Sequence, residues 1–224
     1  MRLFATFIAA LLAPLAAHAA TIYSDAGTWN SAMSSTTSVP LPDTNGGVNS
    51  FSAGDLNFTR SGSASNLVTA NTADYWSTLI PGIDLAISSP EDVTITFGSA
   101  VTGFSFLLHE PSTATGGNNP PDPDTCNTSS CFDTTFNFKL LSGVTELASF
   151  SLNPTDDSAV FVGFSSLTAF DKVVIDDVTN TIDNEYFGDF KTGSIAPIPL
   201  PATLPLLLAS LGGLSLLVRR RAKS

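Results

Sequence analysis

The densest group of side chains that could do chemistry lies between residues 171 and 185. This segment contains two asparagines and five carboxylates, which are Asp171, Asp176, Asp177, Asp183 and Glu185. Calcium takes about six to eight hard oxygen ligands, which a carboxylate-rich loop can supply. The sequence therefore contains a candidate calcium site, with spacing unlike that of an EF-hand loop. The alternative is a solvated acidic loop without a metal.

Groups for nucleophilic or general acid–base catalysis are scarce. Beyond the first twenty residues the single histidine is His109, which follows an apolar run and precedes Glu110. One histidine gives no basis for a Ser-His-Asp triad, and no Gly-x-Ser-x-Gly, phosphate-loop or dinucleotide motif is present. Paired carboxylates would still permit glycoside hydrolysis, but adjacent acids such as Asp156-Asp157 are ordinary turn residues. We predict no catalytic residues and a non-enzymatic protein, and keep a secreted glycoside hydrolase as an alternative.

The two cysteines, Cys126 and Cys131, are separated by four residues. In an oxidising compartment this pair is expected to form a disulfide. Because the closed loop is short, the bond would constrain the loop more than it would stabilise the fold. Metal binding is less favoured, since His109 is the one histidine available as a partner.

Residues 198–224 combine three features in a fixed order. The first is a proline-containing block of Ile198, Pro199, Leu200, Pro201 and Ala202. The second is an uncharged apolar run over residues 204–218. The third is a basic cluster of Arg219, Arg220, Arg221 and Lys223. A full membrane span needs about 20 apolar residues, a length approached when the count starts at Ile198. Basic residues stay on the cytoplasmic side, so the cluster is predicted to stop transfer across the membrane.

The order of block, apolar run and basic cluster resembles the PEP-CTERM class of sorting signals. The residues Ile198–Ala202 are close to the Val-Pro-Leu-Pro-Ala variant of that class, with isoleucine in place of valine, and Gly212-Gly213 also fits the pattern. The resemblance implies an exosortase-type membrane transpeptidase as a partner. It also implies a role in an extracellular matrix, biofilm or exopolysaccharide layer. The alternative is a plain tail-anchored membrane protein.

Residues 1–19 have the organisation of a secretory signal peptide. Arg2 provides the positive start, Leu3 to Leu15 is the apolar region, and Ala17-His18-Ala19 is a small-residue cleavage site. We expect cleavage after Ala19, with Ala20 as second choice; the alternative is a short transmembrane anchor. The chain is thus predicted to be exported, held transiently in the membrane by its C-terminal helix, and then to reach the cell surface or the medium.

The body between these two signals is strongly acidic. It contains all 20 Asp and Glu residues, and its four basic residues leave a formal charge of −16; those four are Arg60, Lys139, Lys172 and Lys191. Such a charge repels nucleic acid and anionic lipid headgroups, so neither is an expected ligand. It attracts cations, including calcium, and it also favours solubility.

The body is predicted to be a single jelly-roll-like antiparallel β-sandwich over residues 20–191, followed by a linker over 192–197. Alternating apolar and polar residues, with turn residues between the runs, are typical of such a fold. The predicted strands cover residues 56–59, 85–88, 93–97, 104–108, 136–140, 147–152, 160–164, 172–176 and 186–190. One helix is predicted near the start, capped by Ser24 or Asp25, with Trp29 and Met33 on one face.

A carbohydrate-binding module is the main alternative function, with an extracellular polysaccharide as partner. Jelly rolls often bind sugars, but this argument is an analogy from fold. Exposure of Trp29, Tyr75 or Trp76 would support it, and burial of these side chains would weaken it.

Overall fold

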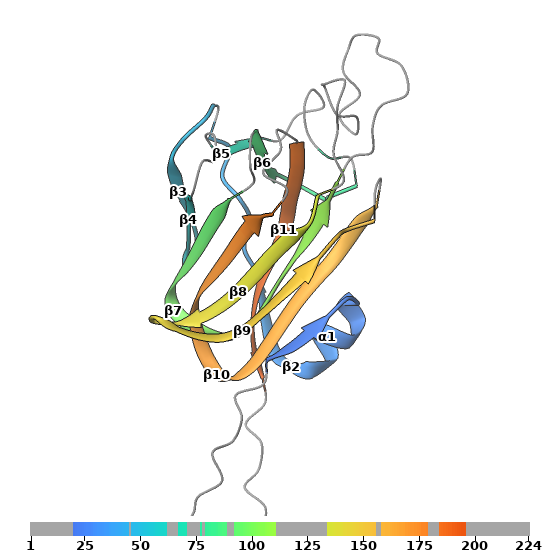
Figure 1. The fold of residues 1–224 in the computed structure, drawn as a ribbon, viewed down its shortest axis with the longest axis vertical. Coiled ribbons are helices and arrows are strands. Elements are labelled where there is room, and N and C mark those ends of the chain that lie inside the picture. Colours follow the sequence, from blue (N-terminus) through green and yellow to red (C-terminus); the bar gives the residue numbers. More distant parts are fainter. Residues whose placement is uncertain are drawn as a thin grey trace, which may run out of the picture.

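A computed structural model describes residues 20–44, 46–61, 67–70, 77, 79–88, 92–110, 134–155, 158–178 and 184–195, without the side chains of residues 68, 70, 88 and 184. Over these residues the chain forms antiparallel strands and one short helix (Figure 1). The elements are β1 (Thr21–Tyr23), α1 (Ala26–Ala32), β2 (Met33–Ser38), β3 (Ser50–Ala53), β4 (Leu56–Arg60), β5 (Leu67–Ala70), β6 (Asp84–Ser88), β7 (Val93–His109), β8 (Phe136–Ser142), β9 (Thr145–Leu152), β10 (Ala159–Asp177) and β11 (Asn184–Ile195).

The predicted mainly β, antiparallel fold is confirmed, and each predicted strand lies within a strand of the structure. The alternation of apolar and polar residues, from which the strands were predicted, is visible at the start of β7. There Val93, Ile95 and Phe97 are buried, whereas Thr94 and Thr96 between them are partly exposed. Period-2 burial of this kind follows from the pleat, because successive side chains point to opposite faces of a sheet.

Two pairs of predicted strands are each one long, bent strand. Residues 93–97 and 104–108 belong to β7, and residues 160–164 and 172–176 belong to β10. The two strands pair with each other before and after the bend, as Thr96 with Lys172 and Gly103 with Ser165, and the register shifts between these points. Because each strand supports the other through the bend, the glycine at position 98 does not end β7.

Hydrogen bonds join all the strands into one sheet that folds over on itself around the β7–β10 bend. Its two halves face each other as a sandwich (Figure 1). The front sheet has the order β3-β4-β7-β10-β8-β9, with the first half of β7 and the second half of β10. The back sheet has the order β5-β6-β11-β7-β10-β1, with the other halves of these two strands, and β2 pairs with the second half of β11.

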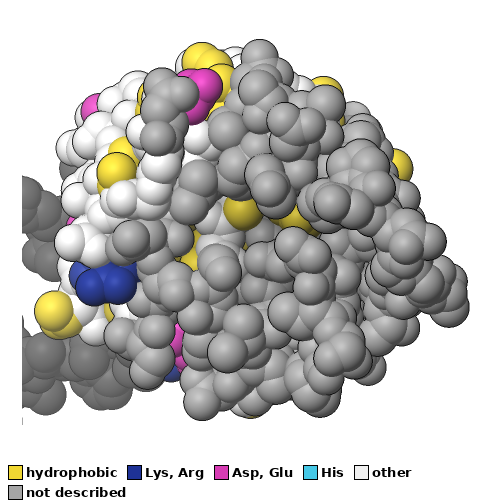
Figure 2. All heavy atoms as spheres, turned by 90° about the horizontal axis from the view of Figure 1, so that it is seen from above, with side chains coloured by type: hydrophobic (Ala, Val, Ile, Leu, Met, Phe, Trp, Pro, Cys, Tyr) yellow, Lys and Arg dark blue, Asp and Glu magenta, His cyan; other side chains and the backbone are white. Residues whose placement is uncertain are grey.

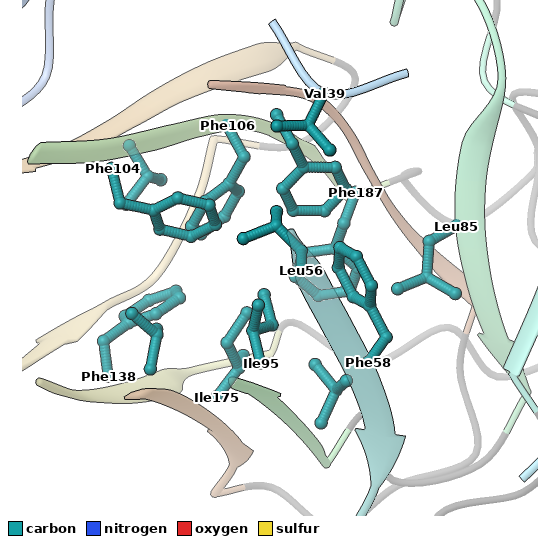
Figure 3. Close-up of a cluster of buried hydrophobic side chains, with 14 of the residues drawn as sticks. Val39, Leu56, Phe58, Leu85, Ile95, Phe104, Phe106, Phe138, Ile175 and Phe187 are labelled. Atoms are coloured by element: carbon teal, nitrogen blue, oxygen red, sulfur yellow. The ribbon is translucent and has the colours of Figure 1, made fainter. Parts of the chain in front are cut away.

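Phenylalanine side chains fill the space between the two sheets (Figure 3). Phe106 of the back sheet lies 5.9 Å from Phe138 of the front sheet, and Phe58 of the front sheet lies 5.0 Å from Phe190 of the back sheet, measured between ring centroids. Aromatic pairs at such distances contribute about 0.5–1.5 kcal/mol beyond their buried area. These phenylalanines therefore belong to the hydrophobic core that the two sheets enclose.

The predicted helix is confirmed as α1, capped by Asp25, whose carboxylate accepts a hydrogen bond from the Thr28 backbone N–H at 2.7 Å. Trp29 is buried against the outer face of the back sheet, where its indole N–H donates to the Phe164 carbonyl at 2.9 Å. Met33 was predicted on the same helical face but is instead the first residue of β2. It ends the helix in an extended conformation, with φ −91° and ψ 139°.

The two ends of the described chain lie at the same end of the sandwich, here called the exit end (Figure 1). Thr21 pairs with Ser165, Ser165 with Gly103, and Gly103 with Gly193, so β1 begins and β11 finishes in one row of the back sheet. The opposite end, where β7 both begins and finishes, is the loop end. The predicted linker over 192–197 is wrong in its first residues, because 192–195 continue β11 and pair with β2 or β7.

Candidate functional site

The structure separates the residues predicted to bind calcium. Asp171 lies at the exit end, where its carboxylate accepts the Gly143 backbone N–H at 2.9 Å. Asp176 and Asp177 finish β10 at the loop end of the front sheet, and Glu185 is in β11 of the back sheet. Asp183 falls outside the described residues. The five-residue set is therefore not one site, because five strand residues between Asp171 and Asp176 span about 16 Å.

A different acid, Asp92, joins Asp176 and Asp177. The carboxylate of Asp92 accepts the Asp177 backbone N–H at 3.1 Å, just before β7 begins. Burial and the neighbouring charges of Asp176 and Asp177 raise the pKa of Asp92 to about 6, against the lowering effect of that hydrogen bond. This contact could not be predicted from the sequence, because Asp92 and Asp177 are 85 positions apart in the chain.

No group of three His, Cys, Asp or Glu side chains within the described ranges is arranged to hold a metal ion. Asp92, Asp176 and Asp177 form a cluster of three carboxylates where two strand ends meet, and their like charges repel one another. Asp92 can take up a proton near pH 6.

Four further polar side chains are buried near the loop end of the back sheet. Tyr186 pairs with His109 in the register of β11 and β7, and their rings stack at 5.8 Å. The residues next to them in the chain, Glu110 and Glu185, are 1 % and 0 % exposed. The Glu110 carboxylate accepts the Thr134 backbone N–H. The burial of His109 and Glu110 was not predicted from the sequence.

Glycoside hydrolysis would need two carboxylates facing one cleft that substrate can enter. Glu110 and Glu185 are almost completely buried. Figure 2 looks onto the loop end, where hydrophobic side chains of the described residues show near the centre. These two glutamates therefore lend the hydrolase alternative no support.

The aromatic side chain proposed for sugar binding is not available at the surface. Trp29 is 0 % exposed and packs on Gly163 and Phe161. Tyr75 and Trp76 lie outside the described residues. By the criterion set from the sequence, the position of Trp29 weakens the argument for a stacking platform at that residue.

The outer face of the front sheet carries small polar side chains and two lysines. One row crosses six strands through register pairs, and its members are Ser50, Thr59, Thr94, Val174, Lys139 and Ser149. The next row towards the exit end contains Asn57, Thr96 and Lys172. These side chains are exposed or half-buried, so the face is open to a partner. Alternation predicted strands here but could not show that they align into rows.

The sorting motif Ile198–Ala202, the basic cluster Arg219–Arg221 with Lys223, and the cysteines Cys126 and Cys131 all lie outside the described residues, as do residues 1–19. Among the residues that the structure describes, no helix is long and apolar enough to cross a bilayer.

Comparisons with known proteins give likenesses to solved structures only, and these are at low identity and low TM-score. No protein-family model and no curated protein matches the sequence. Among solved structures, a mutant of a family 29 carbohydrate-binding module is similar at 10 % identity and a TM-score of 0.34, covering 75 % of this chain and 99 % of that one. The family 11 module of a cellulosomal cellulase from Clostridium thermocellum is similar at 11 % identity and a TM-score of 0.36, covering 74 % and 99 %.

An arabinose-bound α-L-arabinofuranosidase is similar at 12 % identity and a TM-score of 0.39. The match covers 70 % of this chain but 26 % of that enzyme, so the chain spans about a quarter of the enzyme's length. These likenesses assign no ligand or activity to this chain.

Proposed function

We propose that this chain is a non-enzymatic surface protein. It is exported by residues 1–19, held in the membrane by residues 198–224, and then displayed or released by an exosortase-type transpeptidase into an extracellular matrix layer. The β-sandwich is the part that functions outside the cell, and the two terminal segments deliver it there.

The observation that carries this proposal is the common exit end. Thr21 and Gly193 lie in one row of four strands, about 14 Å apart at the usual strand spacing. The nine residues from Ile195 to Leu204 span at most about 30 Å. A domain anchored through this end therefore sits close to the bilayer, with its loop end turned outward. Chain ends at opposite ends of the sandwich would have put the anchor and the exported N-terminus on different sides of the domain.

The charge distribution supports the same orientation. Five buried or half-buried acids lie at the loop end, as Asp92, Asp176 and Asp177 on the front sheet and Glu110 and Glu185 on the back sheet, whereas Asp171 and the exposed Glu146 lie at or towards the exit end. An anionic bilayer surface repels carboxylates within about a Debye length, roughly 8 Å at physiological salt. An anchor at the exit end keeps these groups away from that surface.

A fractionation experiment in the native host tests the sorting step. The double variant Pro199→Ala/Pro201→Ala disrupts the proposed recognition block and leaves the apolar run and basic cluster unchanged. We expect the wild-type protein at the cell surface or in the medium, and the variant retained in the membrane fraction. The control Pro40→Ala removes an exposed proline of the sandwich and should behave like wild type. Equal distribution of the double variant and wild type would contradict the proposal.

A second candidate function is binding of a polysaccharide by the exposed polar face of the front sheet. The rows of hydroxyl and amide side chains described above favour it, because such groups exchange hydrogen bonds with sugar hydroxyls. The two functions are compatible, since a matrix protein needs a matrix partner. Binding of the purified protein to immobilised polysaccharides, with a soluble competitor, tests this candidate.

A further inference from the structure

The front face, defined by the outward side chains of the front sheet, differs in charge from the rest of the body. Two of the four basic residues of the body, Lys139 and Lys172, stand here on the neighbouring strands β8 and β10. Lys139 pairs in register with Val174, and Lys172 pairs with Leu141, so the two lysines are diagonal neighbours. Cβ atoms in such diagonal positions lie about 7–8 Å apart.

These lysines keep their charge available to a partner. Among the described residues, the ion pair is between Lys191 and Asp189, with Nζ and Oδ2 at 2.6 Å, and it involves neither Lys139 nor Lys172. The acids of the front face are Glu146, which lies two strands from Lys172 in the same row on the edge strand β9, and Asp176 at the loop end. The central row from Ser50 to Ser149 carries no carboxylate.

The geometry of the face suits an extended chain. The central row repeats with the spacing between strands, about 4.8 Å, which is close to the length of one sugar residue in an extended polysaccharide. Hydroxyls of Ser50, Thr59 and Thr94 occupy three successive positions of the row, and Lys139 follows after Val174. A chain lying along the row would meet hydrogen-bonding groups first and an ammonium group further on.

We propose that the front face binds a linear acidic polysaccharide, with Lys139 and Lys172 contacting its carboxylates and the hydroxyl row contacting its sugar hydroxyls. No aromatic platform is needed for this mode, because the contacts are hydrogen bonds and charge pairs. The inference rests on the proposed export, since it requires a polymer outside the cell, and it identifies the partner class of the second candidate function.

The test uses the full chain in detergent and alginate, a polyuronate, as the probe. We expect binding that weakens as salt rises, because exposed charge pairs are screened. The double variant Lys139→Gln/Lys172→Gln should raise the Kd for alginate by about tenfold, from two exposed charge contacts. The matched control Lys191→Gln removes the back-sheet lysine that already pairs with Asp189, and it should bind like wild type.

Thermal unfolding of each variant separates loss of binding from loss of folding. Absence of alginate binding by the wild type, or equal weakening by Lys191→Gln, would overturn the proposal. Binding of neutral dextran with the same affinity as alginate would also overturn it, because the lysines would then have no role. None of these results bears on sorting, which the fractionation of the Pro199→Ala/Pro201→Ala variant measures separately.

Discussion

Replacement of Asp92 by asparagine should stabilise the protein at neutral pH. In the folded protein the pKa of Asp92 is raised from 3.8 to about 6, first by burial and then by the charges of Asp176 and Asp177. The folded state therefore binds more protons than the unfolded state between these two pH values. Stability is highest below the unfolded pKa and is lost as pH rises through the folded pKa. Asparagine cannot ionise, and its side-chain oxygen can still accept the Asp177 N–H.

The magnitude follows from the size of the shift and the exposure of the group. A shift of about two pKa units corresponds to about 3 kcal/mol for a completely buried carboxyl. Because Asp92 is half-buried, solvent screening reduces this figure, and we expect about 1 kcal/mol. For a domain of this size, that change in the free energy of unfolding raises Tm by about 2–4 °C.

The assay is thermal unfolding of wild type and Asp92→Asn, followed by circular dichroism from pH 4 to pH 7.5. Changes in Tm with pH that are common to the two proteins drop out of the difference between their Tm values. This difference should be small at pH 4, grow through pH 6 and stay constant above. The control Asp171→Asn changes a half-buried aspartate that also accepts a backbone N–H but lies at the exit end, and its Tm difference is the reference for Asp92→Asn at each pH. A Tm difference independent of pH, or a less stable Asp92→Asn protein at pH 7.5, would refute the reasoning.

Two substitutions test how α1 is fixed to the back sheet. Trp29→Ala removes a completely buried indole and its hydrogen bond to the Phe164 carbonyl, and should lower the free energy of unfolding by about 3–5 kcal/mol in urea denaturation. A loss below 1 kcal/mol would mean that the helix is not part of the cooperative unit. Gly163→Ala should cost about 1–3 kcal/mol, because the added Cβ would lie 2.7 Å from Phe161 Cε1 and 2.9 Å from Trp29 Cδ1. If the Trp29→Ala background removes this cost, the clash with the indole is its cause; an unchanged cost would assign it to Phe161 instead.

The sequence predicted the strands well because their alternation is a local signal. In residues 93–97 and 136–140, apolar side chains occupy every second position, and both segments bury those side chains. A cap of α1 by Ser24 or Asp25 was also predicted, and Asp25 provides it, since a capping aspartate acts within its own turn. Each of these features depends on residues that are close together in the chain.

The missed features depend on contacts between distant residues. Gly98 looked like the end of a strand, but β10 holds β7 through the bend, and only the pairing of the two strands reveals this. Asp92 gained its role from Asp176 and Asp177, and the register of β7 and β11 brought His109 beside Tyr186. The residues predicted to bind calcium do not form one site for the opposite reason. Asp171 and Asp176 are close in sequence, but the extended strand β10 holds them far apart in space.

The intact mass of the mature protein, purified from the membrane and culture fractions of its native host, tests the central claim most directly. If the chain is exported and sorted as proposed, the protein is recovered outside the membrane. It begins at residue 20 or 21 and has lost the residues after the Ile198–Ala202 block. A protein that keeps residues 204–224 and stays in the membrane fraction would contradict this claim, and the chain would then be a tail-anchored ectodomain.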